Sequence, residues 1–189
     1  MRYCIYDTTG RILKFGVAPD EVLPMLEQEG SVLDIGDAFC DDAVQYVEDG
    51  ELVAMPPRPG PTFIFDYALK QWVDPRTLDQ IKAAKWELIK AARDAAEFGS
   101  FVWDGSEFDA DALSQQRIIG AAQLAEINPA FEIDWTLADN SVRTLNAAQM
   151  KSVGTALGAH VNAQHVKARG LRTQIENATT RAEVEAVTW

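Results

Sequence analysis

Histidine and cysteine, which supply many metal sites and nucleophiles, are scarce in this sequence. Its 189 residues include two histidines and two cysteines. Cys4 and Cys40 stand alone, with no second pair and no histidine cluster beside them, so neither a zinc knuckle nor a CxxC redox pair is present. We interpret them as buried thiols in a reducing cytoplasm, with a disulfide as the alternative.

The two histidines do not form a metal-binding pair. His160 and His165 are five positions apart, which separates them by roughly 140° around a helix. Two zinc ligands on one helical face need a spacing of three or four. Motifs for a hydrolase nucleophile elbow, a Walker loop and a dinucleotide-binding loop are also missing. We therefore expect no enzyme activity, no metal and no cofactor.

Long apolar runs and an excess of basic residues are missing too. No segment approaches the roughly 18 apolar residues of a membrane helix, and the opening MRYCIYDTTG does not resemble a signal segment, so we expect a soluble protein without a membrane span. The net charge of −12 and the pI near 4.5 argue against a nucleic-acid partner.

Acidic residues are concentrated at the front of the chain. The first 73 residues hold 13 acids and 5 bases, whereas the remainder holds 16 and 12. A well-solvated surface explains this excess most simply. The alternative is an acidic docking face or a nucleic-acid mimic that inhibits a basic host enzyme.

Prolines divide the chain into regions. MPPRPGPTF, residues 55–63, contains four of the eight prolines and predicts a stiff connector. We predict a β-rich N-terminal domain at 1–54, a Pro-rich linker and strand pair at 55–73, and a mainly helical C-terminal domain with hairpins at 74–189.

In the N-terminal region, apolar and polar residues alternate over short runs, which predicts short strands. RYCIYD and RILKFGV flank a Thr-Thr-Gly turn, and Asp49-Gly50 predicts a tight hairpin within VQYVEDGELVAM. PDEVLPMLEQEG predicts a short helix with Pro24 in its first turn. TFIFDYALKQWVD predicts a further strand pair with a turn near Asp66.

The C-terminal region predicts helices joined by hairpins. Asp74-Pro75 should open a helix that ends at Gly99, with an apolar face of Leu78, Ile81, Leu88, Ile89, Ala92 and Ala96. Two hairpins then each lead into a capped helix. The first turns at Asp104-Gly105, with Asp109 or Asp111 as the cap of a helix rich in Ile118, Ile119, Leu124, Ala125 and Ile127. The second turns at 138–141, with Asn146 as the cap.

The last helix, roughly 147–178, carries a seam of apolar positions at intervals of three or four. Such a seam needs a partner, either within the chain or in another copy of it. We predict an interaction surface that combines this seam with the terminal tryptophan. Its residues are Met150, Val153, Leu157, Val161, Leu171, Ile175 and Trp189. Gly154, Gly158 and Gly170 cost about 1 kcal/mol each against Ala in a helix, so close packing is expected along the helix, or a break near Gly170.

Four carboxylates lie within DGSEFDAD, at Asp104, Glu107, Asp109 and Asp111. The position of the glycine does not fit a calcium loop. Turn and capping roles explain these acids most simply, and a glycosidase pair is the alternative. Among the five tryptophans, we expect Trp103 and Trp135 to pack in the core.

Several phrases from Trp72 onward resemble a C-terminal domain found in tailed-phage and prophage proteins. They are WVDPRTL, FVWDGSEFDAD, SQQRI and DWTLADNSVRTL, followed by the long final helix. That family has no assigned biochemical activity, and its proteins occur as tail fibre proteins, fibre assembly chaperones or other tail components. The resemblance implies partners among phage tail or fibre proteins and no catalytic residues.

Taken together, these patterns predict an α+β protein with a small β-rich domain, a Pro-rich linker and a helical domain that holds two hairpins and a long C-terminal helix. The resemblance implies a tail-associated structural or fibre assembly protein, located in the virion tail or in the host cytoplasm during assembly. We expect it to act by protein–protein contact, with homo-oligomers as a further possibility.

Overall fold

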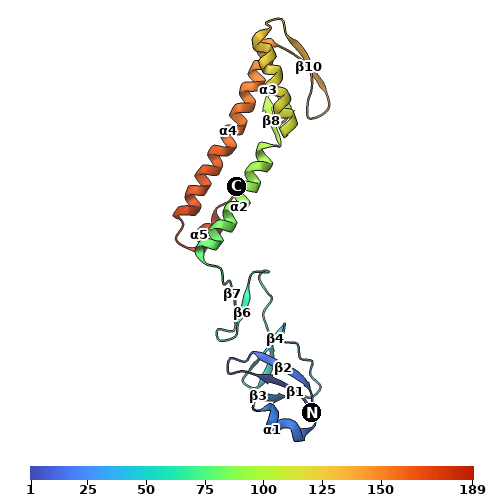
Figure 1. Ribbon diagram of the computed structural model, residues 1–189, viewed down its shortest axis with the longest axis vertical. Coiled ribbons are helices and arrows are strands. Elements are labelled where there is room, and N and C mark those ends of the chain that lie inside the picture. The colour runs from blue at the N-terminus through green and yellow to red at the C-terminus, as the bar shows by residue number, and fades with distance from the viewer. The chain divides into compact units, whose positions relative to one another are not determined.

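The computed structural model describes residues 1–189, apart from the side chains of Asp20 and Leu23. The chain is α+β, as the sequence predicts, and divides into two compact units, Met1–Arg76 and Thr77–Trp189 (Figure 1). The Pro-rich segment and the strand pair after it belong to the first unit.

The first unit is built on a three-stranded antiparallel sheet in the order β2-β1-β3. Its strands are β1 (Arg2–Tyr6), β2 (Ile12–Val17) and β3 (Ser31–Asp34). The 3-10 turn η1 (Asp20–Val22) and the short helix α1 (Leu23–Leu26) connect β2 to β3. The predicted first hairpin and short helix are confirmed, whereas β3 was not predicted.

Both faces of this sheet are covered. Side chains of β1 alternate between the faces, so Cys4 lies in one apolar cluster and Tyr3 and Ile5 lie in another. Cys4 packs with Ile12, Ile35, Cys40 and Val47. Tyr3 and Ile5 pack with Leu26 of α1. β1 is therefore the central element of the unit.

Two hairpins complete the first unit. β4 (Gln45–Glu48) and β5 (Glu51–Ala54) meet at Asp49 and Gly50, whose φ angles of 50° and 79° are both positive, as a tight two-residue turn requires. β6 (Ile64–Asp66) and β7 (Gln71–Val73) follow, and the Asp66 carboxylate accepts hydrogen bonds from the next turn. Both predicted hairpins are confirmed.

The Pro-rich segment is held against the β6–β7 hairpin. In the described backbone, residues 55–63 form neither helix nor strand. The Arg58 guanidinium donates to the carbonyls of Pro61 and Phe63 and lies 5.4 Å from the centroid of the Trp72 ring. The Trp72 indole N–H donates to the Pro56 carbonyl at 2.7 Å. Side-chain bonds thus take the place of a backbone ladder.

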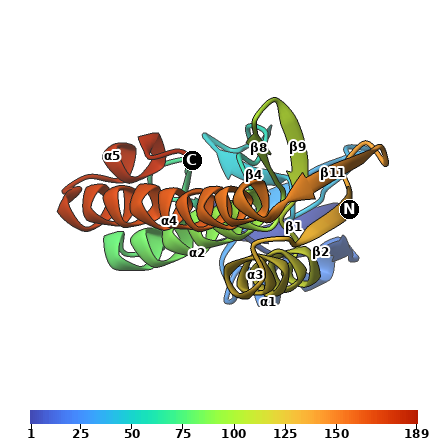
Figure 2. The same cartoon turned by 90° about the horizontal axis from the view of Figure 1, so that it is seen from above.

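The second unit surrounds one long helix. α4 (Ala147–Asn177) packs against α3 (Ala112–Ile127) near its beginning and against α2 (Leu78–Glu97) farther along, as Figure 2 shows from above. The hairpin β8 (Ser100–Trp103) and β9 (Ser106–Asp109) precedes α3. The hairpin β10 (Glu132–Thr136) and β11 (Val142–Asn146) precedes α4. Both predicted hairpin-to-helix segments are confirmed.

The start of α2 differs from the prediction. The helix begins at Leu78 with Thr77 as its cap, and not at Asp74-Pro75. Thr77 and Gln80 form a reciprocal capping box, which satisfies two backbone N–H groups at once. The Asp74 carboxylate instead accepts from the backbone and guanidinium of Arg76. Leu88, expected on the buried face, is 65% exposed.

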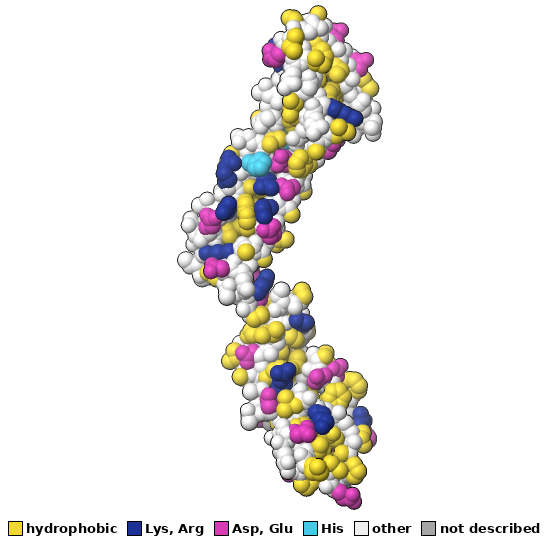
Figure 3. All heavy atoms as spheres, in the orientation of Figure 1, with side chains coloured by type: hydrophobic (Ala, Val, Ile, Leu, Met, Phe, Trp, Pro, Cys, Tyr) yellow, Lys and Arg dark blue, Asp and Glu magenta, His cyan; other side chains and the backbone are white. Residues whose placement is uncertain are grey.

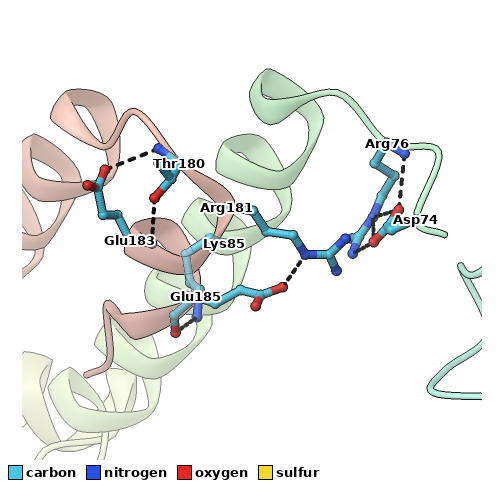
Figure 4. A network of polar contacts seen from close by, with 7 residues as sticks. All are labelled: Asp74, Arg76, Lys85, Thr180, Arg181, Glu183 and Glu185. Atoms are coloured by element: carbon cyan, nitrogen blue, oxygen red, sulfur yellow. Dashed lines mark hydrogen bonds and ion pairs between the residues drawn. The ribbon is translucent and has the colours of Figure 1, made fainter. Parts of the chain in front are cut away.

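A short helix at the end of the chain was not predicted. α5 (Arg181–Ala186) is opened by a capping box between Thr180 and Glu183. The ammonium group of Lys85 on α2 donates to the Glu185 carbonyl at 3.0 Å (Figure 4). Cations are stabilised at helix C-termini, where carbonyls lack helical partners. This contact holds α5 on α2.

The three glycines of α4 have different surroundings. A Cβ at Gly154 would lie 2.9 Å from the Cβ of Ala122 on α3, whereas one at Gly158 or Gly170 would meet nothing within 4 Å. The expected close packing therefore exists at Gly154. The helix is continuous through Gly170, so the break expected as an alternative is absent from the described backbone.

Replacing two of these glycines by alanine should change stability in opposite directions. Gly158→Ala should raise the free energy of unfolding by about 1 kcal/mol, because alanine favours the helix and has room. Gly154→Ala should lower it by about 1–3 kcal/mol, because α3 must move away. Urea unfolding of both variants measures the two changes. An equal gain in both would contradict the close α3–α4 contact.

Candidate interaction site

A groove of about 550 Å³ lies between α3 and the β10–β11 hairpin. Its apolar lining comes from both elements, and polar residues line it as well. The apolar residues are Ala121, Leu124, Ile133, Trp135 and Leu137. The polar residues are Asp109, Ser114, Arg117, Asp134, Thr136 and Asn140. Such a groove fits an apolar side chain that is flanked by polar groups.

The hairpin wall of the groove follows from strand alternation. Ile133 and Trp135 are half-buried and pack against the core, while the residues between them are exposed. On the exposed face, the Thr144 hydroxyl donates to the Asp134 carboxylate at 2.6 Å across the strand pair. Trp135 thus has the core role that the sequence predicts while it also lines the groove.

The helix wall of the groove continues into an exposed apolar face, which we call the α3 outer face: Leu113, Gly120, Leu124 and Ile127. The three large side chains are 52%, 56% and 80% exposed. Spacings of seven, four and three residues place all four on one side of a helix. A Cβ at Gly120 would meet nothing within 4 Å, so no neighbouring side chain covers the helix backbone at the middle of this face.

α3 has an exposed apolar face because apolar residues occur around most of its circumference. Ile118, Ala121 and Ala125 are buried, with Ile118 and Ala125 at most 1% exposed, and these satisfy the contact with α4. The remaining apolar side chains therefore lack cover within the chain. Hydrophobic side chains are visible over this end of the second unit in Figure 3.

One cation lies at the groove without a strong partner. Among the described residues, the Arg117 guanidinium takes part in no hydrogen bond or ion pair. Its charge acts on Asp111, the cap of α3. The Ser114 hydroxyl and backbone N–H hold the pKa of that carboxyl below its ordinary 3.8, and the charge of Arg117 lowers it further. The guanidinium keeps donors available for an incoming carboxylate or carbonyl.

The structure places the predicted interaction residues of α4 mostly inside the unit. Met150, Val153 and Leu157 are at most 2% exposed and pack with α3 and the hairpins. Ile175 is equally buried and packs with Ile89 of α2. Val161 and Leu171 are half-buried at the edges of the two clusters. These side chains stabilise the unit, and their part in binding stays a prediction.

The terminal tryptophan packs back on its own unit. Trp189 is half-buried and contacts the cluster of Ile89, Ala168, Ile175 and Val187. The ammonium nitrogen of Lys167 lies 4.3 Å from the centroid of its ring, a cation–π contact. Trp189 therefore packs within its own unit, and its part in binding stays a prediction.

The four acids of DGSEFDAD serve mainly turns and caps. Asp104, with a φ of 46° in the hairpin turn, forms an ion pair with Arg143 of β11. Glu107 accepts from the Ser100 hydroxyl, and Asp111 caps α3. Asp109 lines the groove. In the described part of the chain, no group of three or more His, Cys or acidic residues is positioned to hold a metal ion.

The two histidines serve the end of α2. The Nε2 atom of His160 lies 3.1 Å from the Ala96 carbonyl oxygen and 3.3 Å from that of Glu97. His165 lies 3.0 Å from the Glu97 carboxylate. Carbonyls in a last helical turn lack partners within the helix, so His160 completes the end of α2.

No described helix combines the length and apolar character needed to cross a bilayer.

Comparison with known families identifies the second unit. Residues 80–188 match the family model of a domain of unknown function, DUF4376. The chain belongs to the DUF4376 family. The DUF4376 region runs from the first turn of α2 to the penultimate residue and contains the whole groove. No curated protein and no solved structure matches the chain.

Sequence reasoning missed the α3 outer face. It described the helix only as rich in Leu124, Ile127 and other apolar residues such as Ile118, without separating the buried side from the exposed one. One feature of the sequence could have indicated this face. The 16-residue helix has more apolar residues than a single buried face can hold. The side chains beyond that buried face are the ones left exposed on α3.

Acid should weaken the second unit through its capping and turn carboxylates. Hydrogen bonds lower the pKa values of Asp111 and Asp139 below 3.8 and that of Glu183 below 4.5. Each group therefore stabilises the fold fully above its ordinary pKa, and this stabilisation is lost as the pH falls through the lower folded value. The urea midpoint of unfolding should fall between about pH 5 and pH 2.

A matched variant isolates this effect. Asp111→Asn, Asp139→Asn and Glu183→Gln together keep acceptor oxygens but remove the titration. The triple variant should show a smaller fall in midpoint than the natural chain over the same pH range. The same pH dependence in both proteins would show that these carboxylates do not contribute.

Proposed function

We propose that this chain is a tail-associated protein of a tailed phage or prophage, either a structural component or a fibre assembly factor. It binds other tail proteins and catalyses no reaction. It acts in the virion tail, or in the host cytoplasm while the tail is assembled. Its partners are phage tail or fibre proteins.

The α3 outer face is the observation that carries this proposal. Leu113, Leu124 and Ile127 are all more than half exposed and lie beside an apolar groove. Exposed apolar patches next to polar groups are typical of protein interaction sites. A partner segment that places an apolar side chain in the groove and an acceptor near Arg117 would satisfy both features.

The link to phage tails is supported by the sequence phrases. WVDPRTL, FVWDGSEFDAD and DWTLADNSVRTL resemble the C-terminal domain of tailed-phage and prophage proteins. Two of these phrases contribute residues to the groove or to its support. FVWDGSEFDAD contains Asp109 and the cap of α3, and DWTLADNSVRTL contains Trp135, Leu137 and Asn140.

The placement of the acids supports a binding role for the second unit. Asp104, Glu107 and Asp111 are held in a turn, a strand contact and a helix cap. A glycosidase needs two carboxylates facing each other across the substrate. Acids that are hydrogen-bonded to their own backbone and neighbours are instead suited to holding the hairpin and α3 in place.

The first unit offers a second contact region. Met1–Arg76 contains 14 acidic and 6 basic residues. Several of its carboxylates, those of Asp7, Asp34, Asp41 and Asp66, accept hydrogen bonds from nearby backbone N–H groups. The others keep a negative surface potential. We propose that this unit binds a second, basic partner, which would make the chain an adaptor.

The proposal is tested by binding to purified tail and fibre proteins from the same phage genome. Leu124→Glu should weaken the binding of the cognate protein by about 30-fold or more, because a buried charge replaces an apolar contact at the groove. Isothermal titration calorimetry measures the affinity. Leu88→Glu, at a 65% exposed position on α2, is the matched control and should bind normally.

Three outcomes contradict parts of the proposal. Failure of every tail and fibre protein to bind would remove the assignment to the tail. Equal loss in Leu124→Glu and Leu88→Glu would remove the α3 outer face as the docking site. Salt-sensitive binding to a basic host enzyme alone would favour the acidic inhibitor. Mass spectrometry of purified particles then distinguishes a virion component from an assembly factor.

A further inference from the structure

The only two cysteines of the chain meet in the core of the first unit. Cys4 is 0% exposed on β1, and Cys40 is 4% exposed on the segment between β3 and β4. Both are free thiols within one apolar cluster. Each thiol also affects the pKa of the other, as side chains packed in one cluster do.

The path of the chain after β3 brings them together. The backbone N–H of Ile35 donates to the Arg2 carbonyl at 3.0 Å, which ties the start of this segment to β1. A turn follows, in which Ala38 donates to Ile35 at 2.8 Å. The backbone N–H of Asp41 then donates to the Gln45 side chain at 2.8 Å. Cys40, between these anchors, is directed back onto the sheet.

We propose that Cys4 and Cys40 are a thiol–disulfide exchange site, which forms an internal disulfide with a small-molecule disulfide such as oxidised glutathione. The proposal rests on the juxtaposition of the two thiols in the core, and it does not depend on the proposed tail function. No other cysteine is present to compete for either sulfur.

The exchange proceeds in two balanced steps. The Cys40 thiolate attacks one sulfur of oxidised glutathione, which breaks that S–S bond, forms a mixed disulfide and releases one glutathione thiolate. The Cys4 thiolate then attacks the Cys40 sulfur and releases the second glutathione. The two protein thiols are oxidised, one glutathione disulfide is reduced to two thiols, and the two protons pass to the released thiolates.

Cys40 is the entry point because of its position. In the described backbone, residues 35–44 form neither helix nor strand, so this segment opens more readily than β1 at the centre of the sheet. Burial is the largest cause that raises the pKa of both thiols, that of Cys4 to about 11, so both thiolates are rare while the unit is closed. Exchange in the folded protein is therefore slow and is limited by opening of this segment.

The disulfide would join the central strand to a segment that regular structure does not hold. The chain-entropy model for a loop of this length gives a folded-to-unfolded ratio that is larger by several hundred-fold. The thiols would persist in a reducing cytoplasm and form the bond in an oxidising environment. The first unit would then be most stable outside the cell.

The test uses the full chain with oxidised glutathione. After acid quenching, denaturation and alkylation with iodoacetamide, the expected product is a monomer with no alkylated cysteine and no attached glutathione, lighter than the thiol form by two hydrogens. Its urea midpoint for the first unit should rise by at least about 1 M, and dithiothreitol should reverse the shift.

Other products overturn the proposal. Two alkylated thiols, two glutathione adducts or a disulfide-linked dimer would each show that the sulfurs do not join within the chain. Cys40→Ala is the matched control, and oxidised glutathione should leave its midpoint unchanged. An equal rise in that variant would show that the stabilisation does not come from the bond.

Discussion

Burial of α4 is the contact on which the second unit depends. This helix contributes Met150, Val153 and Leu157 to one cluster and Ala168 and Ile175 to another. α2 and α3 each cover part of its length, so neither would have a core without it. An isolated helix is only marginally stable in water. In a folded protein, most of a helix's stability comes from the packing of its apolar face. The groove keeps its shape because α4 fixes α3.

Polar side chains determine where the elements of this unit end. Capping boxes open α2, α4 and α5, and Asp111 opens α3. His160 and Lys85 bind carbonyl oxygens in the last turns of α2 and α5. Helix ends leave backbone groups without partners, and these side chains supply them. Two acids of the second unit, Asp111 and Glu183, therefore have a structural role.

The position of the α3 outer face follows from which elements cover α3. α3 has one neighbour helix, α4, which covers Ile118, Ala121 and Ala125. The hairpin β10–β11 extends beside the helix and leaves a groove. Leu113, Leu124 and Ile127 remain exposed because nothing in the described chain packs over them. The face most available to a partner is thus on α3, while the α4 seam holds the unit together.

Local patterns predicted most of the elements. Asp49-Gly50 and Asp104-Gly105 fixed two hairpins through positive φ angles, and Asn146 with Gln149 fixed the start of α4. The start of α2 was misplaced because Asp74-Pro75 and Thr77 with Gln80 are both good helix openings, and only their contacts distinguish them. β3 and α5 were missed because strand pairing and docking on α2 create them.

The sequence by itself determined the α+β class, the turns, the helix caps and the apolar seam of α4, because these depend on residues close together in the chain. Only the tertiary structure decided that the seam faces inward, that α3 lines a groove with apolar residues, and that Cys4 and Cys40 lie in one cluster. Each of these depends on which distant segments compete for the same apolar surface, and spacing along one helix or strand does not contain that information.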